Sequence, residues 1–342
     1  MDVYGSDKQV DQEKILKTRV IENNTDSAEE YLGYLNQCFP GWGDVALYNW
    51  VFDRDVGAGR ADRIFAYHEN EIIGGTGVSY RMITDSKGAK ERIAIMTGSW
   101  TLPAARGKGC FSHLILAMRD QAIKKGCVLL TAFAFKDNAS YGAMLRQNCV
   151  ALPTVYVRDP LVPTKDCQSD NEFLGRYPVS DKFVEELFVS LQKSENDKVR
   201  FTYSLSEWKG QFIGDPAKMG AVSIGHSSKF IFEIANGFLR VLAMYVSEED
   251  NLKSVFANIL QITRKEGFRL FMFSTDSKEI EVMKELELEI IEGGFFLLFA
   301  DKDRYRNWRS LDANHVLKES DLLALENSAY IGNWSIQNRD RI

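Results

Sequence analysis

The first half of the chain begins with a pattern that predicts two helical segments and an antiparallel hairpin. Amphipathic spacing over 27–38 and 45–54 predicts the helices, and the strand-like runs 63–68 and 72–83 meet at a turn over Glu69-Asn70. The positions that follow alternate between strand and helix patterns, which is typical of an α/β fold. These further elements are expected at 92–96 (strand), 110–119 (helix), 128–134 (strand), 140–147 (helix) and 151–157 (strand).

A similar series of patterns returns in the second half. Trp208 stands before it as Trp50 stands before the first series, and the residues over 159–196 between the two series are rich in Pro, Lys, Asp and Ser. The second series predicts strands over 221–224, 230–235 and 238–246, a helix over 248–266, a strand over 268–274, a helix over 277–286 and a strand over 294–300. We therefore predict an α/β protein with mixed (α+β) sheets in two tandem domains, 1–160 and 199–342, the latter with a tail, joined by a connecting segment over 161–198.

The chain between Ser99 and Arg119 has the build of an anion-binding loop. An apolar strand runs into Arg106-Gly107-Lys108-Gly109, and a helix follows directly. Glycines allow a tight turn whose N–H groups converge, and the helix adds unpaired N–H donors and the positive end of its dipole. A phosphate or pyrophosphate fits this loop, and the alternative is a tight turn without a ligand.

Two common phosphate motifs fit these residues badly. A P-loop requires Lys and Ser or Thr after its last glycine, where this chain has Cys110 and Phe111. A dinucleotide fingerprint requires Gly or Ala at the position of Ser112 and an acidic residue about 20 positions later.

The loop resembles the acyl-CoA loop of the GCN5-related N-acetyltransferases (GNAT), whose pattern is [QR]-x-x-G-x-[GA] after a strand that ends in a V-x-P-like turn. Leu102-Pro103 matches the turn, Arg106 the first position and Gly109 the fourth, whereas Phe111 departs from the last. The form R-G-x-G-[LIC]-F-[ST] is similar to the branch of Eis aminoglycoside acetyltransferases. The resemblance implies that acyl-CoA, in the first place acetyl-CoA, is a co-substrate, and that the residues that bind it are Trp100, Thr101, Leu102, Arg106, Gly107, Lys108, Gly109, Cys110, Phe111 and Asn138.

The segment from Asn138 to Cys149 resembles the family's helix after the fifth strand. The family's Tyr, which protonates the departing thiolate, falls on Met144 or Leu145 here, so Tyr141, one turn earlier, is the candidate acid. A packing role on an amphipathic helix is the alternative for Tyr141. Asn148 stands where the family's helix closes with Gly, and Asn tolerates the left-handed conformation of such a cap.

The second domain has no such loop. Between Val246 and the next helix the chain reads Ser247-Glu248-Glu249-Asp250-Asn251, and three acids would repel a pyrophosphate. We therefore predict one working and one degenerate GNAT-like copy, an arrangement that resembles Eis-like enzymes and mycothiol synthase. In that arrangement the second copy completes the acceptor pocket or stabilises the first.

Composition and charge narrow the function further. The 342 residues are 45% hydrophobic and 26% charged, and the net charge of −6 argues against nucleic acid as a partner. No apolar run is long enough for a signal peptide or membrane span, so cytoplasm follows by default. The five cysteines and four histidines form no disulfide framework and no metal site, so we expect no metal. Cys127 and Cys149 are expected to be buried, and Cys110, at a helix N-terminus beside two cations, is the thiol whose pKa is expected to be lowered.

The function that these residues favour is transfer of an acyl group from acyl-CoA to the amine of a small molecule by direct attack on the thioester. An attacking ammonium must first lose a proton, and the candidate bases by position are Asp53, Asp55, Glu69 and Glu71. Two alternatives stay open: a catalytically silent acyl-CoA-binding sensor or scaffold, and a transferase for longer acyl chains. The sequence leaves the acceptor and the oligomeric state open, a homodimer being one arrangement.

Overall fold

The computed structural model describes residues 16–21, 28–54, 57–161, 170–194, 198–213, 218–309 and 334–336. In its first half the elements are β1 (Lys17–Ile21), α1 (Ala28–Cys38), α2 (Val45–Phe52), β2 (Asp62–His68), β3 (Glu71–Thr84), β4 (Lys90–Thr101), the 3₁₀ helix η1 (Pro103–Ala105), α3 (Cys110–Lys124), β5 (Leu129–Phe135), α4 (Ala139–Arg146) and β6 (Val150–Arg158). The helices and strands predicted between 27 and 157 are confirmed, with β4 and α3 longer than expected.

The second half repeats this order. Its elements are α5 (Asp170–Arg176), α6 (Asp181–Ser194), β7 (Val199–Thr202), α7 (Leu205–Gly210), β8 (Lys218–Ile224), β9 (Ser228–Ala235), β10 (Phe238–Tyr245), α8 (Leu252–Lys265), β11 (Arg269–Ser274), α9 (Ser277–Glu285), β12 (Glu289–Phe299), α10 (Lys302–Arg309) and β13 (Trp334–Ser335). The strands and helices predicted between 221 and 300 are confirmed, and Trp208 lies on a short helix as Trp50 does. The domain boundaries at 160 and 198 stay a prediction.

The segment expected to be a linker carries structure of its own. Helices α5 and α6 lie within 159–196, and α6 buries Val184, Leu187 and Leu191. Their spacing of three and four residues places them on one helical face, which packs into the core between the two halves. The Pro and Lys residues that are typical of a linker stand at the start of this segment, before that apolar face. Strands β1, β7 and β13 were not predicted either.

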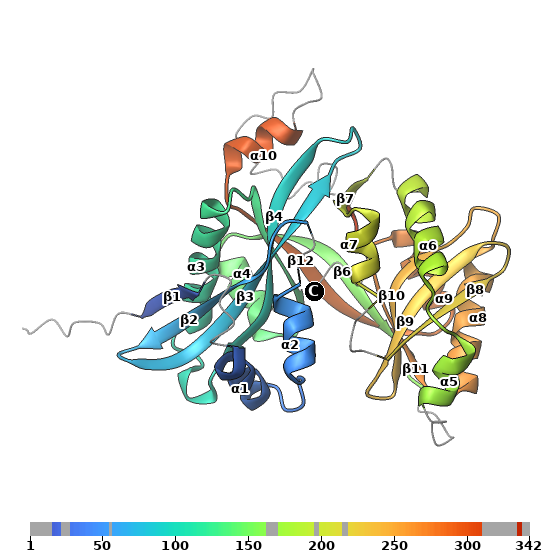
Figure 1. Cartoon of the computed structure of the whole chain (residues 1–342), viewed down its shortest axis with the longest axis horizontal. Helices are drawn as coiled ribbons and strands as arrows, with labels where there is room; N and C mark the ends of the chain where they lie inside the picture. The colour runs from blue at the N-terminus through green and yellow to red at the C-terminus, as the bar shows by residue number, and fades with distance from the viewer. Residues whose placement is uncertain are drawn as a thin grey trace, which may run out of the picture.

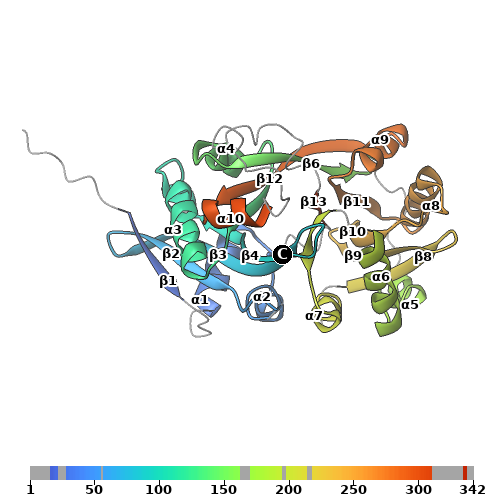
Figure 2. The ribbon, with the colours of Figure 1, turned by 90° about the horizontal axis from the view of Figure 1, so that it is seen from above.

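One sheet runs through both halves in the order β1-β2-β3-β4-β5-β12-β6-β11-β10-β9-β8. Figure 1 shows the first half on the left and the second on the right, with β6 and β12 between them. In Figure 2 the helices α4, α8 and α9 line one face of this sheet, and α1, α2, α6 and α7 line the other.

The two halves exchange their last strands. Strand β12 of the second half pairs antiparallel with β5 over Gly293–Phe299, and β6 of the first half pairs antiparallel with β11 over Val155–Arg158. Strands β6 and β12 also pair with each other. Each half therefore completes its part of the sheet with a strand from the other half.

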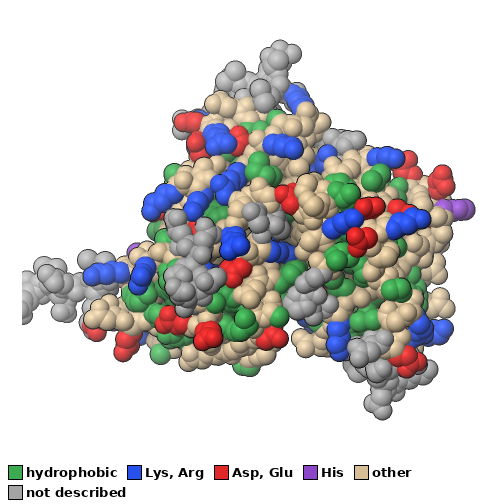
Figure 3. All heavy atoms as spheres, viewed as in Figure 1, with side chains coloured by type: hydrophobic (Ala, Val, Ile, Leu, Met, Phe, Trp, Pro, Cys, Tyr) green, Lys and Arg blue, Asp and Glu red, His purple; other side chains and the backbone are tan. Residues whose placement is uncertain are grey.

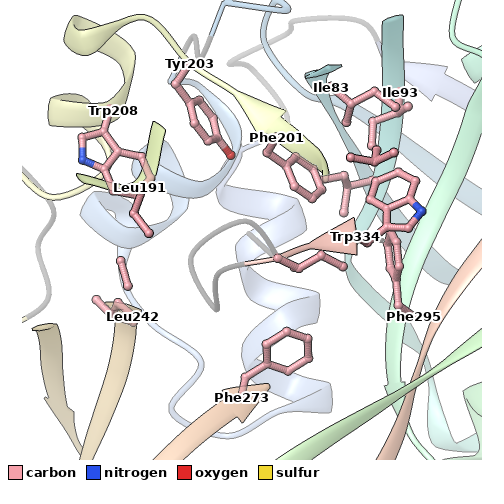
Figure 4. Close-up of a cluster of buried hydrophobic side chains, with 14 of the residues drawn as sticks. Ile83, Ile93, Leu191, Phe201, Tyr203, Trp208, Leu242, Phe273, Phe295 and Trp334 are labelled. Atoms are coloured by element: carbon pink, nitrogen blue, oxygen red, sulfur yellow. The ribbon is translucent and has the colours of Figure 1, made fainter. Parts of the chain in front are cut away.

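The largest hydrophobic cluster fills the space between the halves, and Figure 4 shows part of it. Phe295 of β12 packs edge-on against Trp334 of β13, with ring centroids 5.2 Å apart. Trp208 of α7 and Leu191 of α6 line the same cluster from the second half, and Ile93 of β4 from the first. This shared core joins the two halves through buried side chains as well as through the strands.

In each half one parallel strand pair separates after three residue pairs. Strands β4 and β5 pair only over Ile93–Ile95, and β10 and β11 pair only over Phe238–Arg240. Beyond these residues the backbone edges that face the gap have no sheet partner across it among the described residues. The two gaps are the places where a ligand could enter the sheet.

Candidate functional site

The first gap lies beside the predicted anion loop. Strand β4 ends at Thr101, η1 follows, and Arg106–Gly109 leads into the 15-residue helix α3. Gly107 and Gly109 have φ values of +77° and +78°, a conformation that L side chains rarely adopt, and the space where a Cβ would stand is open at both. The loop therefore turns as its glycines predicted, with the N-terminus of α3 directly behind it.

The charges of this loop are available to a ligand. Arg106 and Lys108 are exposed, and within the described residues neither forms an ion pair. Over the face drawn in Figure 3, basic and acidic side chains are mixed. Two cations beside the amide donors of a helix N-terminus favour an anion at this place.

A cavity of about 850 Å³ extends from the loop into the gap between β4 and β5. Of the ten residues predicted to bind acyl-CoA, it is lined by Trp100, Thr101, Arg106, Gly107, Gly109, Cys110, Phe111 and Asn138. The other two lie elsewhere. Leu102 packs against the core of α1 and α2, and its backbone N–H donates to Ile73 O at 2.9 Å, while the side chain of Lys108 is outside the lining.

Several lining residues were not predicted. They come from the end of α1 (Cys38 and Phe39), from β4 (Met96 and Thr97), from β5 (Ala132, Phe133 and Ala134) and from α4 (Ser140, Ala143, Met144 and Arg146). Local sequence carries no signal for most of them, because they meet only when α1, β5 and α4 pack together. Arg146 could have been suspected as an exposed cation on a helix already matched to the family.

Strand β4 carries a bulge beside the cavity. Gly75 and Gly77 of β3 face Trp100 and Thr97, so Gly98 and Ser99 together oppose the single residue Thr76. The carbonyl of Gly98 accepts a hydrogen bond from the Tyr31 hydroxyl at 2.9 Å, and the hydroxyls of Ser99 and Thr76 lie 2.6 Å apart. A bulge places backbone groups outside the regular ladder, and here it does so where β4 has already left β5.

Tyr141 is turned away from the cavity lining. Its ring packs edge-on against Phe296 of β12, with centroids 4.9 Å apart, and it interacts electrostatically with Lys136, which pairs with Glu292. Of the two positions where the family's Tyr falls, Met144 lines the cavity and Leu145 does not. The position of Tyr141 therefore agrees with the alternative of a packing role. Its role as the general acid stays a prediction that this geometry does not support. Asn148 closes the end of α4 with φ +56°, as expected.

The expectation for Cys110 was wrong. Burial raises the pKa of this thiol, and a hydrogen bond with Thr101 offsets the rise only in part. The desolvation that opposes a thiolate outweighs the helix N-terminus and the exposed cations nearby. Cys127 and Cys149 are buried as predicted, which raises the pKa of each thiol to about 12.

Asp53, Glu69 and Glu71, three of the candidate bases, lie away from the cavity lining. Asp53 pairs with Arg63 at 3.3 Å, and Glu69 and Glu71 are exposed at the β2–β3 turn. Asp55 lies outside the described residues. Thr97, Ser99 and Ser140 provide hydroxyls in the lining, through which ordered water can carry a proton.

The corresponding loop of the second half is closed by its own acid. Both carboxylate oxygens of Asp250 accept hydrogen bonds from the β8–β9 turn, from the N–H groups of His226, Ser227 and Ser228 and from the Ser228 hydroxyl. These bonds lower the pKa of Asp250 to about 2. Asn251 caps α8 by accepting from the Ser254 N–H. Acidic side chains therefore occupy the place of the Gly-rich loop.

The part of the chain that carries the first site matches a known protein family. Residues 28–147 match the family model described as "Acetyltransferase (GNAT) family". These residues form a GNAT domain. No curated protein matches the sequence significantly.

Solved structures extend the GNAT likeness over both halves. A tandem GNAT protein from the clavulanic acid biosynthesis pathway is 12% identical with TM-score 0.55, and the match covers 84% of this chain and 99% of that one. A Saccharomyces cerevisiae N-myristoyltransferase with bound myristoyl-CoA is 12% identical with TM-score 0.57, covering 86% and 81%. A GCN5-related N-acetyltransferase from Anabaena variabilis is 14% identical with TM-score 0.56, covering 83% and 73%. The fold is thus that of tandem GNAT proteins, with a second, degenerate copy.

The described part of the chain contains no helix long and apolar enough to cross a membrane.

Proposed function

We propose that this protein is an acyl-CoA-dependent N-acyltransferase that transfers the acyl group of acetyl-CoA to the amine of a small molecule. The observation that carries the proposal is a single cavity that joins the Arg106–Gly109 loop to the open gap between β4 and β5. The loop suits a pyrophosphate, and the gap offers unpaired backbone edges to the amides of pantetheine.

The two ends of the cavity suit different parts of acetyl-CoA. The loop amides and Arg106 would hold the pyrophosphate, and Arg146 provides a second cation for a phosphate of the same substrate. A thioester laid along β4 from this loop would reach the bulge at Gly98 and Ser99. Backbone N–H groups released by the bulge can stabilise the oxyanion that forms when the amine attacks the thioester carbonyl.

The reaction needs no covalent intermediate on the protein. The amine nitrogen bonds to the acyl carbon, the bond from that carbon to sulfur breaks, and the CoA thiolate leaves. The proton lost by the amine returns to the thiolate through water at the hydroxyls of the lining. Holding the two reactants at the gap supplies most of the rate enhancement in such a mechanism.

Ligand-induced stabilisation tests the binding part of this proposal. Acetyl-CoA at 100 times its dissociation constant should stabilise the protein by about 2.7 kcal/mol, a rise in Tm of roughly 5 °C. Arg106→Glu should abolish the rise. The control is Lys253→Glu, the same charge reversal in the first turn of α8, where the exposed Lys253 pairs with Glu285, and it should keep the rise. Equal rises in all three proteins would place acetyl-CoA elsewhere.

Turnover with a panel of amines separates an enzyme from a catalytically silent acyl-CoA sensor. CoA release that depends on the amine supports acyltransfer. Stabilisation by acetyl-CoA without acylation of any amine would favour the sensor.

A further inference from the structure

Residues from both faces of the sheet line the cavity, and the two faces differ. Ala132 and Ala134 of β5 belong to the cluster beneath α3 and α4, whereas Phe133 belongs to the opposite face, in the core between the halves. The pyrophosphate loop leads into α3, and α3 covers the face of Ala132 and Ala134. The acceptor would therefore approach from the opposite face, that of Phe133.

Two aromatic side chains line the cavity on this acceptor face. Phe39, just beyond the end of α1, is 46% exposed, and it lines the cavity as Phe133 does. An aromatic side chain that remains this exposed beside a cavity offers its surface to a ligand.

The ring of Phe133 is held from two sides by the second half. It stacks on Phe295 of β12 with centroids 4.7 Å and planes 21° apart, and it meets Phe273 of β11 edge-on at 5.8 Å. Phe295 is fully buried, and Figure 4 shows Phe273 and Phe295 as parts of the same core. The second half thus fixes the orientation of a ring that lines the first half's cavity.

We propose that the acyl acceptor is a primary amine on an aromatic or otherwise apolar body, bound against Phe39 and Phe133, and that these two side chains determine acceptor specificity. This inference rests on the proposed acyltransferase function. A flat apolar body buries its surface against the rings and gains the additional energy of ring contacts. A polyamine would have to remove further charges from water at the same surface, which costs free energy.

The test compares two primary amines with acetyl-CoA as the donor. We expect kcat/KM for 2-phenylethylamine to exceed that for spermidine by at least ten-fold. Phe39→Ala should raise KM for 2-phenylethylamine about five-fold, the size of one aromatic contact, with KM for acetyl-CoA unchanged. Phe39→Leu should recover part of the loss. Ile123→Ala is the matched control, because Ile123 of α3 is 48% exposed but lies outside the cavity lining, and it should change neither constant.

Calorimetry of 2-phenylethylamine binding to the complex with CoA gives a second readout that needs no turnover. There Phe39→Ala should weaken binding by the same factor.

Two results would overturn this inference and leave acyltransfer standing. One is a kcat/KM for spermidine equal to or above that for 2-phenylethylamine. The other is a Phe39→Ala variant whose amine KM is unchanged but whose preference between acetyl-CoA and octanoyl-CoA shifts, which would assign the apolar wall to the acyl chain. Absence of acylation for every amine, with acetyl-CoA still bound, would overturn the proposed function and this inference with it.

Discussion

The two halves use one scaffold for opposite purposes at the same turn. In the first half the residues between β4 and α3 include two glycines in the left-handed conformation and two exposed cations. In the second half the residues between β10 and α8 include Asp250, which accepts hydrogen bonds from three consecutive backbone N–H groups of the β8–β9 turn. The first loop is open to an anion from solution. In the second, a carboxylate of the loop itself binds the N–H groups of the β8–β9 hairpin turn.

This difference shows that the GNAT framework of strands, gap and helix does not by itself make a binding site. Both parallel pairs separate after three residue pairs, and both β4 and β10 are irregular near their gaps. The two halves differ at this turn in a few loop residues, while the shared framework of strands and helices is structural in both.

Because β6 and β12 are exchanged between the halves, we expect that the first half does not fold on its own. A fragment of residues 1–160 would leave β5 without the partner that pairs with it over Gly293–Phe299, and it would expose the aromatic core beneath. We expect the fragment to show no cooperative thermal transition by circular dichroism and to aggregate during size-exclusion chromatography. The full chain, prepared in the same way, is the control. A fragment that melts cooperatively and is stabilised by acetyl-CoA would show that the first half folds without β12.

Removing the charge of the Asp250 carboxylate, which binds the β8–β9 turn, is expected to lower thermal stability moderately and in a pH-dependent way. Because the folded-state pKa of Asp250 is lowered to about 2, its stabilisation is fully present above the unfolded value near 4 and is lost as the pH falls towards 2. Asp250→Asn should therefore lower Tm on the order of 2 °C at pH 7, and the difference from the native chain should narrow between pH 5 and pH 2. Differential scanning calorimetry across this range measures it. A difference that stays constant with pH would show that the charge of Asp250 is not what stabilises the turn.

Substitution of Tyr141 is expected to have the smallest effect, a small change in the rate of acyl transfer. Its ring packs against Phe296, so Tyr141→Phe retains that contact and removes only the hydroxyl. We expect kcat with the best amine to change by less than two-fold, and the basic limb of the pH profile to stay in place. A loss of about 100-fold or more, the scale of a missing general acid, would restore Tyr141 as the proton donor.

The sequence by itself determined those features that depend on neighbouring residues. Gly107 and Gly109 take the left-handed conformation that their lack of a side chain permits, and Asn148 does the same at the end of α4. The order of strands and helices followed from periodicity, and the acids before α8 indicated that the second loop differs. Each of these is a short-range property, readable within a few residues.

Only the tertiary structure decided which distant segments meet. Strand β12 pairs with β5, roughly 160 positions earlier in the chain, and no local pattern distinguishes this pairing from a strand that stays in its own half. The same holds for the cavity wall formed by Phe39 and Phe133, for the direction of Tyr141, and for the burial that raises the pKa of Cys110. Side-chain direction and desolvation depend on what packs against a residue, and in this protein the other half of the chain often provides it.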